Sequence, residues 1–588
     1  AAMLFGDWGT SRLYVLGLAF FYSGMASPWH VLAMCLLLVV VAWAYTVVCR
    51  SFTDGGGVYS AAKATHRQAA VVGAFLLFAS YVVTAAISAV AAFRYFGASA
   101  DAAPMFAIIS LFLIGAVNFV GPRHAGGLAV YVAGATLIVT VILAAFCVPH
   151  LSFERWAADG RVVSTQWFSF VHIILALSGV EAIANMTGIM VEPVGRTSKR
   201  SIWPVLAEVV LFNLIFVVAM TMLPNLPTGI MAERASASLS ETDLALRDTM
   251  LRVLAEVYVN RYFAIGAAIV FGLLLLSAVN TAIAGMISVQ YAMARDEEMP
   301  AAFTRLNIFG VPWVALATAC GVCTILLLVE GEVDKLGHLY AIGVVGAICI
   351  NLGSTCINRA IEIKTWERIA LGAIAAFLFV VECTVAMQLS ALAFGASVIA
   401  GGYLLRTLVK SAPAITTHLP QMADTVSKWF EEPPLPEGVL ATIELPPFDP
   451  AKPKILVASR GNPDLIRFAG EEAKQRGANL LVLFVRDLAV SYGPAAAKSP
   501  QPERDPEARE MFATAQAVAA EHQIPMMPIY CLARSVPDMI LDFAGTYAVD
   551  FLILGVSRRG AVFRALRGDV ITKVADYLPS ETTLLIHA

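Results

Sequence analysis

The sequence FGDWGTSRLYVLGLAFF (Phe5–Phe21) begins a long apolar run with an aspartate, two glycines, a threonine, a serine and an arginine. An ionisable side chain inside a membrane span costs on the order of 3 kcal/mol, so Asp7 is a candidate functional residue. Gly6 and Gly9 flank it, and glycines beside polar residues indicate a helix that unwinds and turns its carbonyls toward a cavity. The stretch therefore predicts a broken membrane helix.

A second stretch of this character is ALSGVEAIANMTGIM (Ala176–Met190). Glu181 lies there among glycines and small polar residues, and no basic residue occurs within two helical turns of it in the sequence. The two stretches fall in the first and sixth of the predicted spans. This separation is expected of a LeuT-like 5+5 inverted repeat, in which two broken helices form the central site and two further spans follow.

The composition indicates a membrane protein. Of the 588 residues, 59% are hydrophobic and 14% are charged, and the mean hydropathy is +0.74, which is far more apolar than an ordinary soluble chain of this length. The net charge of -3 does not supply the basic face that nucleic-acid binding needs. We therefore expect the lipid bilayer, and no nucleic acid, as a partner. The broken helices further indicate a transporter and not an enzyme.

A window of about 20 residues, the length that crosses the hydrocarbon, identifies twelve candidate spans. Because this number is even, both termini lie on one side of the membrane. The loops on that side carry most of the arginine and lysine. By the positive-inside rule we expect a multi-pass protein of the cytoplasmic (inner) membrane with both termini in the cytoplasm. The twelve spans centre near Gly17, Val39, Thr84, Leu113, Val139, Leu177, Phe212, Leu275, Val322, Val345, Phe379 and Ile399.

The longest loop on the opposite side, residues 224–261, contains DLALRDTMLRVLAEVYV. Its apolar spacing predicts a helix that lies over the outer mouth of the bundle.

The character of the sequence changes after Val409. Residues 411–452 are rich in proline and polar residues, which predicts a linker between an all-α membrane domain at 1–410 and a further domain at 453–588. The latter alternates helical stretches with the strand-like runs KILVASR, NLLVLFVRD, IPMMPIYCL, VDFLILGVS and TTLLIHA. This alternation predicts a cytoplasmic α/β domain whose parallel sheet is covered on both faces. An exposed last strand would invite edge pairing, so we expect a homodimer through this domain.

Polar side chains in the first, third and tenth spans provide hard oxygen donors. Those that recur every four or seven residues share one helix face, and together with a carboxylate they can replace the hydration shell of an alkali cation. They are Asp7, Tyr14, Ser80, Thr84, Ser88 and Tyr340.

Structural alternatives exist for each of these side chains. A serine or threonine hydroxyl in a span can simply bond to a carbonyl one turn back. A tyrosine near the end of a span can belong to the interfacial aromatic belt. Asp7 can also lie at a helix start and pair with Arg12.

Four short motifs resemble those of known potassium transporters. GDWGTSRLY resembles the GDIGTSPLY signature of the Kup potassium-uptake family, and SYVVTAAIS, ALSGVEAIAN and LYAIGV resemble DYVLTVAVS, ALTGVEAISN and the tenth-helix motif of the KimA-type transporters. Both groups belong to the amino acid-polyamine-organocation superfamily. The resemblance covers most of the first 409 residues.

The resemblance implies secondary active K⁺ uptake, with H⁺ symport, by alternating access. Glu181 would be the proton-coupling acid, while Ser80 stands where the family has an acid. The residues that would hold K⁺ are Asp7, Tyr14, Thr84, Ser88, Ser178 and Tyr340.

Three other functions stay open. An amino-acid permease would hold its substrate carboxylate at the first break, where Asp7 would repel it. A polyamine or other organic cation would want aromatic surfaces, which Trp8 and Tyr340 offer. A transceptor would bind its ligand in the membrane domain and report it through the α/β domain.

The C-terminal domain resembles universal stress proteins. Their nucleotide loop reads G-x2-G-x9-G-[ST], and here GVSRRGAVFRALRGD follows the fourth strand-like run. Arginine forks suit phosphate, and KimA-type members are inhibited by cyclic di-AMP at such a domain. The resemblance implies a regulatory nucleotide (cyclic di-AMP or ATP/AMP) and no obligatory cofactor, the alternative being a solvated rim that serves dimerisation. The candidate residues are Arg460, Gly555, Arg558, Gly560, Gly568 and Asp569.

Overall fold

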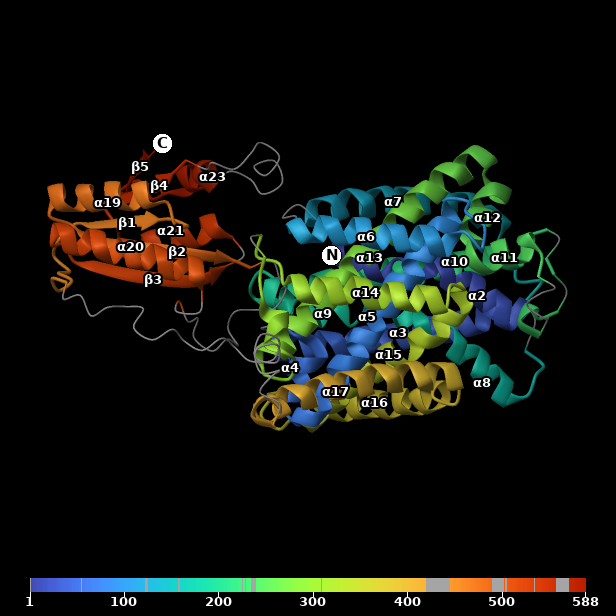
Figure 1. The fold of residues 1–588 in the computed structure, drawn as a ribbon. Coiled ribbons are helices and arrows are strands. Elements are labelled where there is room, and N and C mark those ends of the chain that lie inside the picture. The colour runs from blue at the N-terminus through green and yellow to red at the C-terminus, as the bar shows by residue number, and fades with distance from the viewer. Residues whose placement is uncertain are drawn as a thin grey trace.

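The structure, a computed structural model, consists of a helical bundle and a smaller α/β unit (Figure 1). It describes residues 2–587 except 54, 122–124, 157–158, 225, 228, 234–238, 308, 419–444, 489–501, 503–504, 534 and 557–569.

The bundle contains the first seventeen helices. They are α1 (Ala2–Trp8), α2 (Arg12–Ser23), α3 (Ser27–Ser51), α4 (Gly57–Lys63), α5 (Arg67–Tyr95), α6 (Ala103–Val120), α7 (Ala125–Cys147), α8 (Val163–His172), α9 (Ala182–Asn185), α10 (Val194–Thr221), α11 (Glu241–Asp248), α12 (Met250–Tyr258), α13 (Arg261–Arg295), α14 (Trp313–Val329), α15 (Val333–Ile357), α16 (Thr365–Val385) and α17 (Leu389–His418).

The helices agree with a multi-pass membrane protein. Among the described residues, nine are long and apolar enough to cross a bilayer, or ten if the bent pair formed by residues 163–172 and 174–185 is one span. One of the nine runs from Leu4 to Ser51 and includes two predicted spans, and Trp313–Val329 is a shorter apolar helix. All twelve predicted centres lie in helical segments, while the number of twelve crossings stays a prediction.

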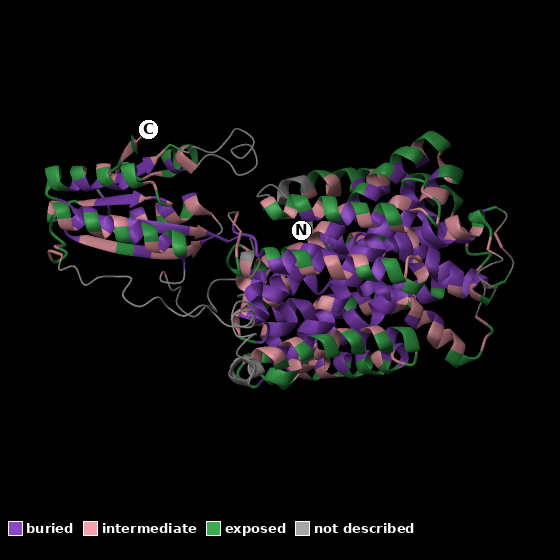
Figure 2. Ribbon diagram, viewed as in Figure 1, coloured by how far each residue is buried: buried purple, intermediate pink, exposed green. Residues whose placement is uncertain are grey.

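Helix α5 lies at the centre of the bundle, and α16 and α17 lie at its periphery. In their apolar windows, 89% of the α5 residues are buried, against 33% in α16 and 17% in α17. Figure 2 shows the same distribution, with buried residues concentrated in the middle of the bundle. The polar side chains of Ser80, Thr84 and Ser88 on α5 are therefore inside the protein and face other helices.

The predicted surface helix is two helices, α11 and α12, separated at Thr249. They lie at the end of the bundle away from the α/β unit (Figure 1). Helix α11 rests on α2 so closely that a Cβ atom at Gly17 would lie 2.0 Å from the Arg247 carbonyl oxygen. This pair covers one end of the first span.

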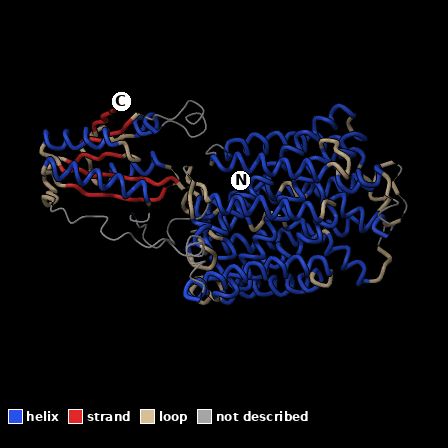
Figure 3. Tube along the Cα trace, viewed as in Figure 1, coloured by secondary structure: helices blue, strands red, loops and turns tan. Residues whose placement is uncertain are grey.

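The α/β unit confirms the predicted parallel sheet (Figure 3). The strand order is β3-β2-β1-β4-β5, and all neighbours are parallel. The strands are β1 (Lys454–Ala458), β2 (Asn479–Asp487), β3 (Met526–Ala533), β4 (Phe551–Gly555) and β5 (Thr583–His587).

Two apolar layers cover the sheet, as predicted. Side chains of α19 (Pro463–Arg476) and α20 (Pro506–His522) form one core with the sheet. Those of α21 (Val536–Thr546) and α23 (Val570–Tyr577) form the other. Strand β5 is the last strand at one edge of the sheet and is only partly buried.

The loop after β2 contacts the helical bundle. Leu488, which follows β2, is buried against the apolar core of the bundle, and a Cβ atom at Gly310 would lie 2.1 Å from the Asp487 carbonyl oxygen. Helix α17 continues to His418, so the predicted linker begins inside this helix, and most of it lies outside the described residues.

Candidate functional site at the two helix breaks

The first break separates α1 from α2. Helix α1 ends at Trp8 and α2 begins at Arg12, with a turn between them. The Thr10 hydroxyl donates a hydrogen bond of 2.5 Å to the Asp7 carbonyl, and the Ser11 hydroxyl donates one of 2.8 Å to the Trp8 carbonyl. The polar residues of the motif thus satisfy backbone groups that the break leaves without helical partners.

The second break lies in the sixth predicted span. Helix α8 ends at His172, a 3₁₀ turn covers Ile174–Leu177, and α9 begins only at Ala182. Ser178 has an extended ψ of 135°, Gly179 has a φ of +89°, and the two halves of the span are bent by 41°. Both interruptions inferred from the sequence are therefore present.

The two breaks touch each other. A Cβ atom at Gly179 would lie 2.6 Å from the Trp8 backbone nitrogen and 2.9 Å from the Trp8 Cα. Since an L side chain also disfavours the positive φ, this position suits glycine alone. The backbone contact brings Asp7 of the first break next to Ser178 of the second.

Asp7 is buried, with 2% of its surface exposed. Among the described residues its Oδ1 has no hydrogen-bond partner. Arg12 pairs with Glu208, with Nη1 2.6 Å from Oε1. A buried acceptor without a partner is costly, and either a proton on the carboxyl group or a bound cation would reduce this cost.

Three of the predicted donors gather around Asp7. Tyr14 and Tyr340 both lie beside Ser178, and both feel the charge of Asp7. The Ser178 and Tyr340 hydroxyl oxygens are buried without hydrogen-bond partners among the described residues. Two tyrosines, a serine and a carboxylate from three separate spans thus meet in one place.

The other two predicted donors lie on α5. The Thr84 hydroxyl donates a 2.9 Å hydrogen bond to the Ser80 carbonyl one turn back, which is the structural alternative for such residues. The Ser88 hydroxyl is buried without a partner in the described part of the chain. No hydrogen bond among the described residues joins either side chain to Asp7.

Glu181 shares the same buried region. Ser80 donates a hydrogen bond of 3.3 Å to Oε1 of Glu181, and Oε2 has no partner among the described residues. Glu181 also interacts electrostatically with Asp7 and Tyr340. Ser80 therefore orients this carboxyl group.

The sequence reasoning missed Tyr81 and Asn185. The Asn185 side chain donates a 2.5 Å hydrogen bond to the Tyr81 hydroxyl, and Tyr81 feels the charge of Glu181. A Cβ atom at Gly57 would lie 2.1 Å from Asn185 Oδ1, so the first residue of α4 packs directly on this side chain. The sequence signal for both residues was their position: Tyr81 directly follows Ser80, and Asn185 lies one helical turn after Glu181.

The structure describes only two of the six residues that were predicted to bind a nucleotide. Arg460 follows β1 and Gly555 ends β4, and these two strands are neighbours in the sheet. They therefore lie at the carboxyl edge, where parallel sheets bind ligands. The other candidates, Arg558, Gly560, Gly568 and Asp569, lie outside the described residues. Across the described ranges, no group of three or more His, Cys, Asp or Glu side chains is arranged to hold a metal ion.

Comparisons with known proteins identify both parts of the chain. A family described as "Amino acid permease" matches residues 1–405, and the universal stress protein family matches residues 453–585. Two solved structures resemble the chain at 19% identity and a TM-score of 0.18 each: a universal stress protein in complex with cAMP, and one from Archaeoglobus fulgidus. Each covers 23% of this chain, and the chain covers 97% and 92% of theirs. No curated protein matches. The chain belongs to the amino acid permease family of the amino acid-polyamine-organocation superfamily and carries a C-terminal universal stress protein domain.

Proposed function

We propose that this permease imports K⁺ together with H⁺ by alternating access. The observation that supports K⁺ is the buried carboxylate of Asp7, whose Oδ1 has no partner among the described residues, at the contact between the two helix breaks. A cation that leaves water needs oxygen donors and negative charge in return. Asp7, Ser178 and the two tyrosines beside it supply both.

Charge balance supports a role for Glu181 in proton coupling. Asp7 and Glu181 interact electrostatically within one buried region, and two uncompensated carboxylates there would repel each other. A K⁺ ion at Asp7 and a proton on Glu181 together remove both negative charges. The site that holds both ions is then neutral, and we expect this state to close and to reorient toward the other side of the membrane.

The family match favours a second candidate, the transport of an amino acid, a polyamine or another organic cation. Trp8, Tyr14 and Tyr340 are buried around Asp7, and aromatic faces attract ammonium groups. A negative charge in the first break favours an amine over an α-carboxylate. A transceptor with the same ligand site is the third candidate.

A regulatory role for the C-terminal domain is the next part of the proposal. It belongs to the universal stress protein family, and Arg460 lies at the ligand edge of its sheet. We propose that a nucleotide such as cyclic di-AMP or ATP/AMP binds there, and that edge strand β5 pairs two copies of the chain. The charges of the loops favour a cytoplasmic location for this domain and for both termini.

Uptake of ⁸⁶Rb⁺ into liposomes that contain the purified protein tests the proposal. With an inward proton gradient, unlabelled K⁺ should suppress uptake, while Na⁺, arginine and putrescine should not. Exchange by putrescine or arginine without Rb⁺ entry would favour the second candidate. Binding without exchange would favour the transceptor.

Two variants assign the roles. Asp7→Asn should abolish Rb⁺ uptake, and Glu181→Gln should remove its stimulation by the proton gradient. Glu382→Gln is the matched control, because Glu382 is also an acid with a buried oxygen that has no partner among the described residues, but it belongs to peripheral helix α16. Normal uptake by Asp7→Asn would contradict the site.

A further inference from the structure

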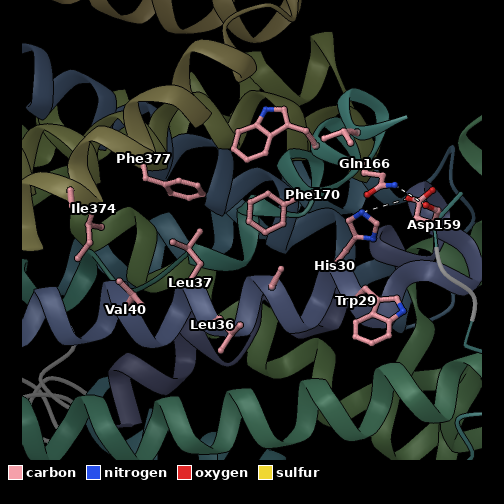
Figure 4. A pocket seen from close by; sticks show the side chains of 14 residues that line it. Trp29, His30, Leu36, Leu37, Val40, Asp159, Gln166, Phe170, Ile374 and Phe377 are labelled. Atoms are coloured by element: carbon pink, nitrogen blue, oxygen red, sulfur yellow. Dashed lines mark hydrogen bonds and ion pairs between the residues drawn. The ribbon is translucent and has the colours of Figure 1, made fainter. Parts of the chain in front are cut away.

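A groove with a volume of about 960 Å³ lies between α3, α8 and α16 (Figure 4). One end is polar and contains His30, Asp159 and Gln166, while the remainder is apolar and aromatic. The apolar lining includes Leu36, Leu37, Val40, Phe170, Ile374 and Phe377.

The groove opens on the lateral surface of the bundle. Trp29 is 50% exposed and Leu36 is 61% exposed, as expected for side chains that face lipid. His30 lies in the first turn of α3 and Asp159 lies in the loop before α8, at the end of the bundle away from the α/β unit (Figure 1). The polar end is thus at a membrane interface, and the apolar part extends toward the bilayer centre.

Asp159 is a carboxylate that is held in position by Arg161. Its Oδ1 accepts a hydrogen bond of 2.9 Å from Nε of Arg161, and its Oδ2 accepts one of 2.8 Å from Nη2. These bonds lower the pKa of Asp159 below its usual range. Each carboxylate oxygen has a second lone pair, so Oδ2 can accept a further hydrogen bond.

His30 presents a second acceptor to the same place. Its Nδ1 lies 3.2 Å from the Ala26 carbonyl oxygen, and a carbonyl can only accept, so Nδ1 carries the proton of the neutral ring. Nε2 then has a lone pair and lies 3.8 Å from Oδ2 of Asp159. Both side chains are at least nine-tenths buried, and among the described residues no donor bridges the two atoms.

We propose that this groove binds one phospholipid with a primary-amine headgroup. The ammonium group donates one N–H to Nε2 of His30 and another to Oδ2 of Asp159, and an acyl chain follows Leu37, Phe377 and Ile374. A quaternary ammonium has no N–H to donate, and an anionic headgroup meets the Asp159 carboxylate. The groove therefore selects phosphatidylethanolamine over phosphatidylcholine and phosphatidylglycerol.

The lipid would act on the broken sixth span. Helix α8 is the first half of that span, and Trp167 on α8 lines the groove and donates a 2.9 Å hydrogen bond to the Thr384 hydroxyl of α16. A bound lipid adds contacts between α8 and its neighbours α3 and α16. Occupancy of the groove thus stabilises the present position of α8, whichever solute the permease carries.

Lipid retention by the purified full-length protein tests this site. The delipidated protein is exposed at pH 8 to equal amounts of phosphatidylethanolamine, phosphatidylcholine and phosphatidylglycerol with identical chains. Native mass spectrometry then counts the bound lipids. Hydrogen bonds to an ionised group predict about a tenfold preference for phosphatidylethanolamine over phosphatidylcholine.

Two variants locate the preference. Asp159→Asn and His30→Phe should each reduce the ratio to about one, because each removes one acceptor or its charge. His30→Phe keeps the ring volume and gives the same readout if Asp159→Asn does not fold. The matched control is Glu154→Gln, which neutralises an exposed acid in the same loop and should leave the ratio unchanged.

Three results would overturn the proposal. They are equal retention of the three lipids by the wild-type protein, a preference that survives both variants, and displacement of the bound lipid signal by soluble ethanolamine at low millimolar concentration. The last result would show an amine site that does not need a lipid.

Discussion

Gly179→Ala should separate the two helix breaks. The positive φ of +89° costs a residue with a Cβ atom about 1–2 kcal/mol. The new Cβ would also lie 2.6 Å from the nitrogen and 2.9 Å from the Cα of Trp8. Because these are backbone atoms, no side-chain rotation relieves the overlap, and overpacking adds about 1–3 kcal/mol.

The combined cost is about 2–5 kcal/mol, which corresponds to a loss of roughly 30-fold or more in the population of the state in which the breaks touch. Two measurements report it. The initial rate of solute uptake into liposomes should fall by at least this factor, and the melting temperature of the purified protein should drop by a few degrees. The second measurement does not depend on the identity of the solute.

Gly266→Ala is the matched control. Gly266 lies inside α13 with nothing within 4 Å of an added Cβ and without a positive φ, so uptake should be unchanged and the melting temperature should stay the same or rise slightly. A Gly179→Ala protein with wild-type uptake and melting would show that the contact between the breaks is not required, and the reasoning about the site would fail with it.

Two further predictions concern stability and reactivity. Arg12→Met leaves the carboxylate of Glu208 without its partner, which should lower the free energy of unfolding by about 3–5 kcal/mol. Lys335→Met breaks a pair with Glu332 in which the side chains are 50% and 44% exposed, and this should cost below about 1 kcal/mol. Equal losses in thermal melts would contradict this. Burial raises the pKa of Cys531 to about 11, so less thiolate is present at pH 8. Iodoacetamide should therefore modify Cys531 about 100-fold more slowly in the folded protein than in the denatured protein. Peptide mapping would measure both rates. Its rate should rise with pH until about 11, and equal rates in both states would refute the burial argument.

Much of the fold could be predicted because the relevant signals are local. Each strand of the α/β domain is a continuous apolar run between helical stretches, and such runs indicate buried parallel strands. The breaks at Asp7 and Glu181 could be found because an acid next to glycine is conspicuous inside an apolar run. The surface helix was predicted as one piece because apolar spacing does not reveal an interruption at Thr249.

The partners of the site residues could not be predicted in this way. One interpretation of the sequence paired Asp7 with Arg12, which instead pairs with Glu208 at a separation of 196 residues. The bond from Ser80 to Glu181 spans 101 residues, and the contact of Tyr81 with Asn185 spans 104. No periodicity links such positions.

Local chemistry in the sequence therefore determined which segments are apolar, which are interrupted and which carry an acid. The tertiary structure decided which interruptions meet, through backbone contacts that only glycine permits, such as Gly179 on Trp8 and Gly343 on Ser80. It also brought His30, Asp159 and Ile374 to one groove. The physical reason is that the cost of burying a polar group depends on its own residue type, whereas its compensation depends on side chains that reach it only when distant helices pack.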